Sequence, residues 1–587
     1  MNNTPLLYRV EAHDLAGHRL KVTLTIAEPA PEGQQVSLPA WIPGSYLIRD
    51  FSRQIESISA LAGNRKRNVA KVDNHTWQVA PCAGPLTLQY VVYAWDLSVR
   101  GAHVDQTHAF FNGTSVFMRV HGQEHTACCV ELVAPTEAQG WQVYTSLPAA
   151  PGREGARRNG FGRYQASDYD ALIDHPVEMG TGRAVRFTAH GAPHEMVFTD
   201  ASPDIDLARI ARDVQKICEA QIAFFEPRTK RAPFLDSADR YVFMTQVTAN
   251  GYGGLEHRAS TALMAARKDL PLMGQAEAGE GYQTFLGLVS HEYFHTWHVK
   301  RIKPQAFVPY DLTRPNLTRL LWVFEGFTSY YDDLFLLRAG VIDKPAYLRL
   351  LAKTITQVHA TPGRLKQSVA ESSFDAWTRY YKQDENSPNA LVSYYTKGSL
   401  VALGLDLLIR EQTAGKKSLD DVMHLLWKRY GRDFYRGKQA GVPENAMAGI
   451  VMEATGVNVQ RFLRDHVDGC ADVPLAKLLP AAGLALTWKA SAQHPLGARL
   501  RKTADGVAIA TVIEGSTAHR AGLSAGDIVV AIDGVRVDGQ AMLEAAIARS
   551  PVGTTLVLHV FRNDLLRAFN VRIRTNANQE AQIAPAQ

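Results

Sequence analysis

The spacing of apolar residues changes twice along this chain of 587 residues, and the changes divide it into three regions. In the first region apolar and polar residues alternate, as they do in residues 20–26 and 86–93. Alternation places apolar side chains on one face of a strand and cannot produce the apolar stripe of a helix. We therefore expect residues 1–180 to form an all-β domain with a sandwich-like fold.

The second region, residues 181–478, carries apolar residues at intervals of three and four, which is typical of amphipathic helices. An apolar run at residues 241–245 predicts a strand near its start. We expect an α+β domain whose second half is mainly helical. The expected helices cover residues 205–225, 282–299, 317–339, 345–359, 395–412 and 419–430.

The third region, residues 479–577, returns to short strands and has the length of a small separate domain. Its expected strands are residues 506–513, 528–532 and 555–561, and its expected helix is residues 540–549. The whole chain is thus predicted to be a multidomain α+β protein. Residues 578–587 are polar and rich in alanine, and we expect them to form a flexible tail.

The composition excludes several classes of function. The 63 Lys and Arg residues and 58 Asp and Glu residues leave a net charge of +5, without the concentrated basic face of a nucleic-acid-binding protein. Five cysteines without repeating spacing predict neither a disulfide framework nor a cysteine zinc site. The sequence shows no signal peptide and no apolar segment long enough to span a membrane, so we expect a cytoplasmic protein without a membrane partner.

One short motif predicts a metal site. His291 and His295 are four residues apart within the predicted helix 282–299, so both imidazoles can bind one ion. Glu292 lies one step around the same turn, where it can act as general base and then general acid. Without a metal, two histidines and a glutamate would be buried among apolar residues without partners. We therefore expect a hydrolase with one zinc ion per chain.

A third ligand should come from a separate segment, and Glu325 is the candidate. It is the single glutamate at an otherwise apolar helix start, thirty residues after His295. The alternative is a buried glutamate paired with Arg319 or Arg338. His298 follows His295 by three residues and points to another side of the helix, so we expect it to support a ligand or lie at the surface.

These motifs resemble those of the gluzincin metallopeptidases, the thermolysin-like and aminopeptidase-N-like superfamily. The pairing of His-Glu-x-x-His with Trp322-Val-Phe-Glu325-Gly-Phe-Thr-Ser-Tyr330 carries the resemblance. Gly253-Gly-Leu-Glu-His257 is similar to their Gly-x-Met-Glu-Asn motif, which implies that Glu256 binds the amino group of the substrate. The segment from Tyr394 to Gly398 is similar to their Tyr-Glu-Lys-Gly motif.

That last similarity implies that Tyr395 donates a hydrogen bond to the oxyanion, with Tyr394 as the neighbouring alternative. Two features depart from the aminopeptidase-N pattern, namely the longer gap before Glu325 and His257 in place of asparagine. Without the resemblance, Glu256 would be equally consistent with a carboxylate in a surface loop.

The whole chain more closely resembles the glycyl aminopeptidase family. That family joins a β domain bearing Trp-x-Pro-Gly-Ser-Tyr, here residues 41–46, to a thermolysin-like domain and a PDZ domain. Taken alone, the residues of the turn 41–46 predict a packed corner between strands. Residues 518–534 resemble the PDZ segment of bacterial proteases, and residues 495–500 are the candidate loop for a peptide C-terminus. The alternative is a PDZ domain that binds no peptide.

The resulting hypothesis is a zinc aminopeptidase acting on peptides with a free N-terminus. The resemblance implies a preference for small N-terminal residues such as glycine and alanine. The alternatives are a metallo-endopeptidase to which the PDZ domain delivers substrates, and an inert peptide-binding scaffold. The site residues are His291, His295 and Glu325 for the metal, Glu292 and Tyr395 for catalysis, and Glu256 for the substrate amine.

Overall fold

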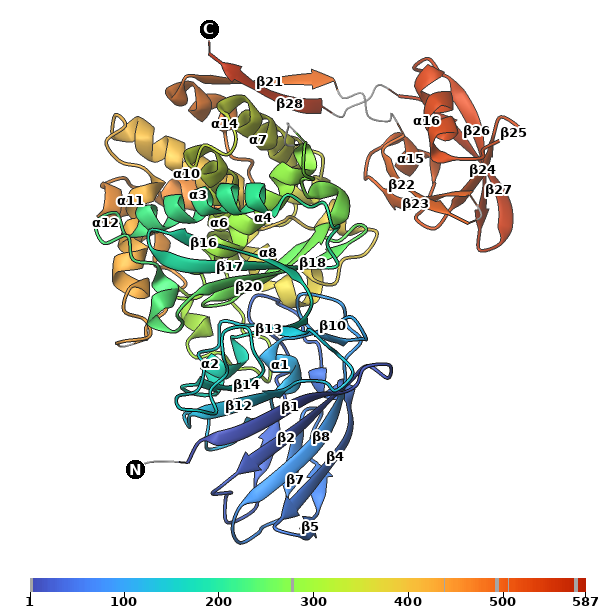
Figure 1. The fold of residues 1–587 in the computed structure, drawn as a ribbon. Helices are drawn as coiled ribbons and strands as arrows, with labels where there is room; N and C mark the ends of the chain where they lie inside the picture. Colours follow the sequence, from blue (N-terminus) through green and yellow to red (C-terminus); the bar gives the residue numbers. More distant parts are fainter. Residues whose placement is uncertain are drawn as a thin grey trace. The chain divides into compact units, whose positions relative to one another are not determined.

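The computed structural model describes residues 4–275, 279–437, 439–490, 496–504, 506–574 and 579–586 (Figure 1). The chain forms two compact units. The first unit comprises Met1–Asn316, Tyr331–Ile342 and Leu426–Pro443. The second unit comprises Leu317–Tyr330, Asp343–Leu425 and Glu444–Gln587.

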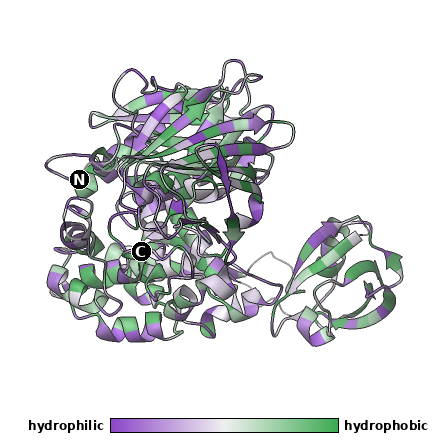
Figure 2. Ribbon diagram, turned by 90° about the horizontal axis from the view of Figure 1, so that it is seen from below, coloured by the Kyte–Doolittle hydropathy of each residue, from purple (hydrophilic) through white to green (hydrophobic). Residues whose placement is uncertain are grey.

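The N-terminal part of the first unit is built mainly from antiparallel strands with one buried face, and β1 and β12 are a parallel pair within it. Its largest sheet has seven strands, and along β1 and β2 buried residues alternate with partly exposed ones. The strand ribbons change between hydrophobic and hydrophilic colours in the same way (Figure 2). This confirms the all-β prediction for the start of the chain. In sheet order the strands are β14 (Gly162–Ala166), β12 (Cys128–Val133), β1 (Leu6–Asp14), β2 (Arg19–Ile26), β8 (Leu86–Tyr93), β4 (Ile55–Ala62) and β5 (Arg65–Arg67).

Two four-stranded sheets complete this β region. One has the order β13 (Gln142–Tyr144), β15 (Val177–Gly180), β10 (His108–Phe111) and β9 (Ala102–Val104). The other has the order β11 (Arg119–Val120), β3 (Gln35–Ser37), β7 (Thr76–Val79) and β6 (Val69–Lys71).

A five-stranded mixed sheet follows in the first unit. Its three central strands run parallel, and β19 pairs antiparallel with β20 at one edge. Helices α3 (Leu207–Phe225) and α4 (Glu280–Phe294) pack beside each other along this sheet (Figure 1). The strand order is β16 (Arg183–Ala189), β17 (Ala192–Thr199), β18 (Tyr241–Thr248), β20 (Ser260–Ala266) and β19 (Gly253–Glu256).

The second unit begins with helices. Helix α10 is buried over most of its surface, because it is apolar on nearly all sides and other helices surround it. The strongly periodic predictions for residues 345–359 and 395–412 are confirmed. The helices between residues 321 and 426 include α5 (Leu321–Phe324), α6 (Gly326–Arg338), α7 (Lys344–His359), α10 (Thr396–Gln412) and α11 (Leu419–Leu426).

Two predicted helices differ from the observed ones. The helix expected over 282–299 ends at Phe294, and tight turns replace its last part, with Val299 at a φ of 147°. The helix expected over 317–339 is divided at Glu325, where the backbone leaves α5 and enters α6. In both places the backbone bends beside a predicted site residue.

The C-terminal small domain has a sheet with an apolar core between its strands and helices. The predicted strands and the helix 540–549 are confirmed. The strands run in the order β22 (Ala498–Thr503), β23 (Gly506–Val512), β24 (Ile528–Ile532), β26 (Thr555–Arg562) and β27 (Leu565–Arg572), with β25 (Val535–Arg536) beside β24. The helices are α15 (Thr517–Ala521) and α16 (Gln540–Arg549).

The end of the chain corrects the prediction of a flexible tail over residues 578–587. Strand β28 (Gln579–Pro585) pairs antiparallel with β21 (Leu484–Ala490) along its whole length. The Ala581 side chain is buried, and its backbone N–H donates to Thr356 Oγ1 of α7 at 2.9 Å. β21 therefore belongs to this separate two-stranded sheet and not to the small domain predicted over residues 479–577. Among the described helices, none has the length and apolarity needed to cross a membrane.

The hydrogen bond between Thr356 and Ala581 gives a testable link between α7 and β28. Thr356→Val removes the acceptor and should lower the free energy of unfolding by about 1 kcal/mol, because the N–H of Ala581 loses its partner. Thr356→Ser keeps the hydroxyl and is the matched control. Urea unfolding of both variants measures the difference, and equal stability of the two would contradict this role of the bond.

Candidate active site

Two predicted metal ligands lie together at the end of α4. His291 is in the last turn and His295 is the C-cap residue, and their ring centroids are 4.7 Å apart. His295 is almost fully buried. Because residues four apart leave a helix in the same direction, the two imidazoles can bind one ion.

Both histidines are oriented through Nδ1. His291 Nδ1 lies 3.0 Å from Asp332 Oδ2, and His295 Nδ1 lies 2.8 Å from the backbone oxygen of His298. An imidazole that donates from Nδ1 presents Nε2 to a metal. His298 thus supports a predicted ligand through its carbonyl group. The sequence motifs do not single out Asp332, although it follows Glu325 by seven residues, the spacing of one helix face.

Among the described side chains, three groups offer ligand atoms that all lie within 4.8 Å of one another. They are His291, His295 and Glu325; Glu256, Glu292 and His295; and His103, Asp105 and His108. The first group combines two imidazoles with one carboxylate, which is a donor set of catalytic zinc sites. The second has two carboxylates and a single imidazole. The donors of the first group therefore fit zinc better.

Glu292 lies against the edge strand β19. Glu292 is 5% exposed, and a Cβ atom added to Gly254 would collide with the Glu292 carboxylate. The missing side chain at Gly254 therefore lets the strand pass close to the carboxylate. Because β19 is the last strand of its sheet, its outer edge has no neighbouring strand in that sheet.

Glu256, at the end of the same strand, is held under the turn 41–46 of the β region. A Cβ atom on Gly44 would collide with the Glu256 carboxylate, and Gly44 has a φ of +91°, where glycine is favoured. Ile42 of the turn and Leu255 share one apolar core. Glu256 is 4% exposed, and its Oε1 has no hydrogen-bond partner among the described residues.

The turn 41–46 is therefore more than a packed corner between strands. It contacts the carboxylate predicted to bind the substrate amine, and Trp41 Nε1 donates to the backbone oxygen of Asp311 at 2.9 Å. In the sequence, the glycine within this aromatic turn is the one sign that another group packs closely against the turn. Sequence reasoning could not identify its neighbour, because about two hundred residues separate Gly44 from Glu256.

In the second unit, Gly326 and Gly398 let the segment after Glu325 pack against the segment that begins at Tyr394. A Cβ atom on Gly326 would lie 2.7 Å from Cα of Gly398 and 2.9 Å from the backbone oxygen of Tyr394. The backbone after Glu325 thus packs directly against the start of α10. Burial raises the pKa of the Tyr394 hydroxyl well above its usual value, and the nearby Tyr381 and Glu325 side chains raise it further.

The two candidate tyrosines differ in exposure. Tyr394 is 0% exposed, whereas Tyr395 is partly exposed and stacks on Tyr394 with ring centroids 4.7 Å apart. The hydroxyl of Tyr395 lies 3.3 Å from that of Tyr381. Tyr395 is therefore the more accessible of the two.

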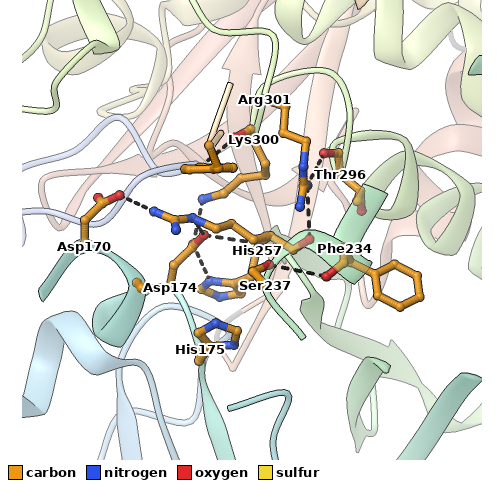
Figure 3. Close-up of polar contacts among 12 residues, drawn as sticks. Asp170, Asp174, His175, Phe234, Ser237, His257, Thr296, Lys300 and Arg301 are labelled. Atoms are coloured by element: carbon orange, nitrogen blue, oxygen red, sulfur yellow. Dashed lines mark hydrogen bonds and ion pairs between the residues drawn. The ribbon is translucent and has the colours of Figure 1, made fainter. Parts of the chain in front are cut away.

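Directly after Glu256 the chain enters a buried ionic network centred on Asp174 (Figure 3). Asp174 Oδ1 accepts from Lys300 Nζ at 2.7 Å and lies 3.1 Å from His257 Nδ1. Asp174 Oδ2 accepts from the backbone N–H of Arg258 at 3.2 Å, and its contact with the Arg258 guanidinium is 3.1 Å. His257, which replaces the asparagine of the related motif, therefore anchors the end of β19 to the rest of the unit.

Asp174 keeps its charge despite burial. Burial alone would raise the pKa of Asp174, but the Lys300 ammonium, with His257 and Arg258, outweighs it and holds the pKa well below its usual value. Because the folded-state pKa is lowered, the ionised group stabilises the fold above its unfolded pKa of about 4. That stabilisation is lost as the pH falls from there toward the folded pKa.

Asp174→Asn should destabilise the protein by about 3–5 kcal/mol near pH 7, because it leaves buried cations without their counter-charge. The difference from the unchanged protein should shrink as the pH falls below about 4. Denaturant unfolding across pH measures it. Asp239→Asn, at a side chain that is 77% exposed, is the control, and a pH-independent difference would contradict the role of charge.

Comparisons with known proteins agree with this architecture. The family model described as Peptidase M61 N-terminal domain matches residues 7–181, that described as M61 glycyl aminopeptidase matches residues 284–401, and that of the PDZ domain matches residues 495–573. No curated protein matches the chain.

Two solved structures illustrate the range of similarity. An aminopeptidase N family protein from Idiomarina loihiensis is 39% identical, with a TM-score of 0.93 over 99% of this chain and 98% of that one. An M1 zinc metallopeptidase from Deinococcus radiodurans, bound to a Tyr-Ser-Ala substrate, is 14% identical, with a TM-score of 0.47 over 81% of this chain and 95% of that one. The full-length match and the family models lead to one conclusion: the chain belongs to the M61 glycyl aminopeptidase family of metallopeptidases.

Proposed function

We propose that this metallopeptidase is a zinc aminopeptidase that removes single residues from the N-terminus of peptides. The observation that carries the proposal is the grouping of Glu256, Glu292 and His295, whose polar atoms lie within 4.8 Å of one another. A buried carboxylate at this distance from the general base suits an ammonium group one residue away from the bond that is cut.

The proposed metal ligands are His291, His295 and Glu325, with one zinc ion at this site. The hydrogen bonds at Nδ1 of both histidines support this assignment, because they fix the ring orientation that a ligand needs. When zinc is bound, it lowers the pKa of a water molecule and polarises the scissile carbonyl group.

Three side chains carry the remaining steps. Glu292 accepts a proton from the attacking water and passes it to the leaving amine. Tyr395 donates a hydrogen bond to the oxyanion, and its exposure relative to Tyr394 supports that choice. Glu256 holds the substrate ammonium, and the outer edge of β19 can align the peptide backbone as an added strand.

The proposed preference is for small N-terminal residues, glycine and alanine. The family description supports it, and so does the burial of Glu256 beneath the turn 41–46. A carboxylate that is 4% exposed and covered by Gly44 leaves little room beside the substrate amine. A large first side chain would have to displace this turn.

The PDZ domain is proposed to bind a peptide C-terminus along β22. This strand is at the edge of its sheet and packs near α16, so its outer backbone groups are available to an added strand. Pro495, the first residue of the predicted carboxylate-binding loop, lies outside the described residues. Within the rest of the loop Gly497 has a φ of +67°.

Glu292→Gln should keep the zinc content and reduce kcat by about 10²–10⁴-fold, because the amide cannot take a proton from water. Elemental analysis measures the metal in the same preparation that is assayed for hydrolysis of a glycyl peptide. Activity near that of the unchanged enzyme, in a variant with full zinc content, would refute the assigned role of Glu292.

Glu256→Gln should distinguish an aminopeptidase from an endopeptidase. For peptides with a free N-terminus, kcat/KM should fall by a factor equivalent to about 2–5 kcal/mol, because one partner of a buried charge pair is lost. Cleavage of N-acetylated peptides should be negligible in both proteins. A panel of free and acetylated peptides beginning with glycine, alanine or leucine measures both terminal and side-chain preference.

The same panel tests the turn over Glu256. Gly44→Ala should raise KM for free peptides, because the new methyl group displaces the carboxylate while its charge remains. Gly84→Ala is the matched control, since Gly84 also has a positive φ, +77°, but its added Cβ meets no atom within 4 Å. Equal activity on free and acetylated peptides would favour the endopeptidase.

A further inference from the structure

A second cluster of metal-binding side chains lies in the β region of the first unit, on the hairpin formed by β9 and β10. His103 is opposite Phe110 in the ladder, and the turn is closed by the backbone N–H of Asp105, which donates to the backbone oxygen of His108 at 3.0 Å. Since side chains alternate along strands, His103, Asp105 and His108 share one face of the hairpin.

The Asp105 carboxylate is fixed by the turn that follows it. Its Oδ1 accepts from the backbone N–H of Thr107 at 2.6 Å, from the Thr107 hydroxyl at 2.6 Å and from the backbone N–H of His108 at 3.1 Å. Oδ2 is directed instead toward His103 Nε2, at 3.3 Å. One carboxylate oxygen therefore orders the turn, while the other faces the histidines.

His108 is oriented by a buried carboxylate. Its Nδ1 lies 3.1 Å from Glu178 Oε1 on β15, and that same oxygen accepts from the Thr199 hydroxyl at 3.0 Å. A carboxylate on Nδ1 fixes the tautomer that presents Nε2 to a metal. The pairing of His108 with Glu178 resembles the pairing of His291 with Asp332, where a carboxylate also lies beside Nδ1. His108 and Glu178 lie on neighbouring strands of one four-stranded sheet.

The separation of His103 from Asp105 suits two ligands of one metal ion. Two zinc ligands at tetrahedral angles are about 3.3 Å apart, given metal bonds of about 2.0–2.1 Å, and this equals the separation of His103 Nε2 from Asp105 Oδ2. The same separation is long for a hydrogen bond to a carboxylate. All three ligand atoms lie within 4.8 Å of one another.

The surroundings also suit an ion that enters from one side. His103 is 3% exposed and His108 is 1% exposed, and Trp95 stacks on His103 with centroids 4.8 Å apart. The Asp105 side chain is 28% exposed, so water or an ion can approach there. Such a site has three protein ligands and one position for water.

We propose that His103, Asp105 and His108 bind a second divalent transition metal ion, zinc by the character of its donors, which fastens the β9–β10 hairpin. This site is separate from the catalytic one, and the proposal does not depend on the proposed function. Its contribution is to stability, because binding to the folded chain alone shifts the unfolding equilibrium.

The test measures zinc in protein that has been loaded with zinc chloride and then desalted. The unchanged protein should hold two zinc ions per chain, and the double variant His291→Gln/His295→Gln should hold one. Adding His103→Gln to that double variant should remove the remaining ion. Adding His18→Gln should not, because His18 stacks on Trp95 but contributes no ligand atom to the cluster.

A second readout covers variants that fold poorly. Zinc should raise the Tm of the His291→Gln/His295→Gln protein and leave unchanged the Tm of the same protein carrying His103→Gln, with circular dichroism confirming the folded state of both. Two results would each overturn the proposal: a double variant that holds no zinc, or a His103→Gln triple variant that holds as much zinc as its parent.

Discussion

Two carboxylates and an imidazole are buried together at the end of α4, and the close approach of the two carboxylates governs the site. Glu256, Glu292 and His295 are each at most 5% exposed, and one ligand atom of each lies within 4.8 Å of those of the other two. Burying two carboxylates close together is costly. The proposed zinc and the substrate ammonium would each place positive charge beside these carboxylates, so the site is complementary to cations.

Such a site requires rigid support, and an ionic network directly after Glu256 in the chain provides it. Glu256 faces the site, while the next residues, His257 and Arg258, turn into the opposite network around Asp174. Basic side chains and carboxylates gather there, and the Tyr435 ring centroid lies 3.9 Å from Cζ of Arg258. The basic residues are Arg258, Lys300, Arg301 and Lys303, and the carboxylates are Asp170, Asp174 and Asp236.

Periodicity and spacing predicted the features that are local in the sequence. The helical repeat located α3, α7 and α10, and the four-residue spacing paired His291 with His295. The features that were missed depend on segments that meet only in the folded chain. Asp332 reaches His291 from another helix, and Gly44 covers Glu256 from another domain. No local propensity records such contacts, because they are set by how sheets and helices pack.

The final strand, β28, also depends on segments that meet only in the folded chain. Its polar, alanine-rich sequence has little strand propensity of its own, and it becomes a strand because β21 supplies a hydrogen-bonding edge and α7 covers one side. A partner almost a hundred residues earlier is invisible to a local pattern.

The pairing of β21 with β28 also defines how the small domain is joined to the chain. Ala490 and Gln579 are direct cross-strand partners, and the PDZ domain occupies the chain between them. The domain is thus an insertion at the tip of a β-hairpin, not an appendage at the C-terminus. A turn of two residues could in principle close this hairpin in its place. Because Ala490 and Gln579 are already paired, replacing the PDZ domain by such a turn would leave the register of β21 and β28 unchanged.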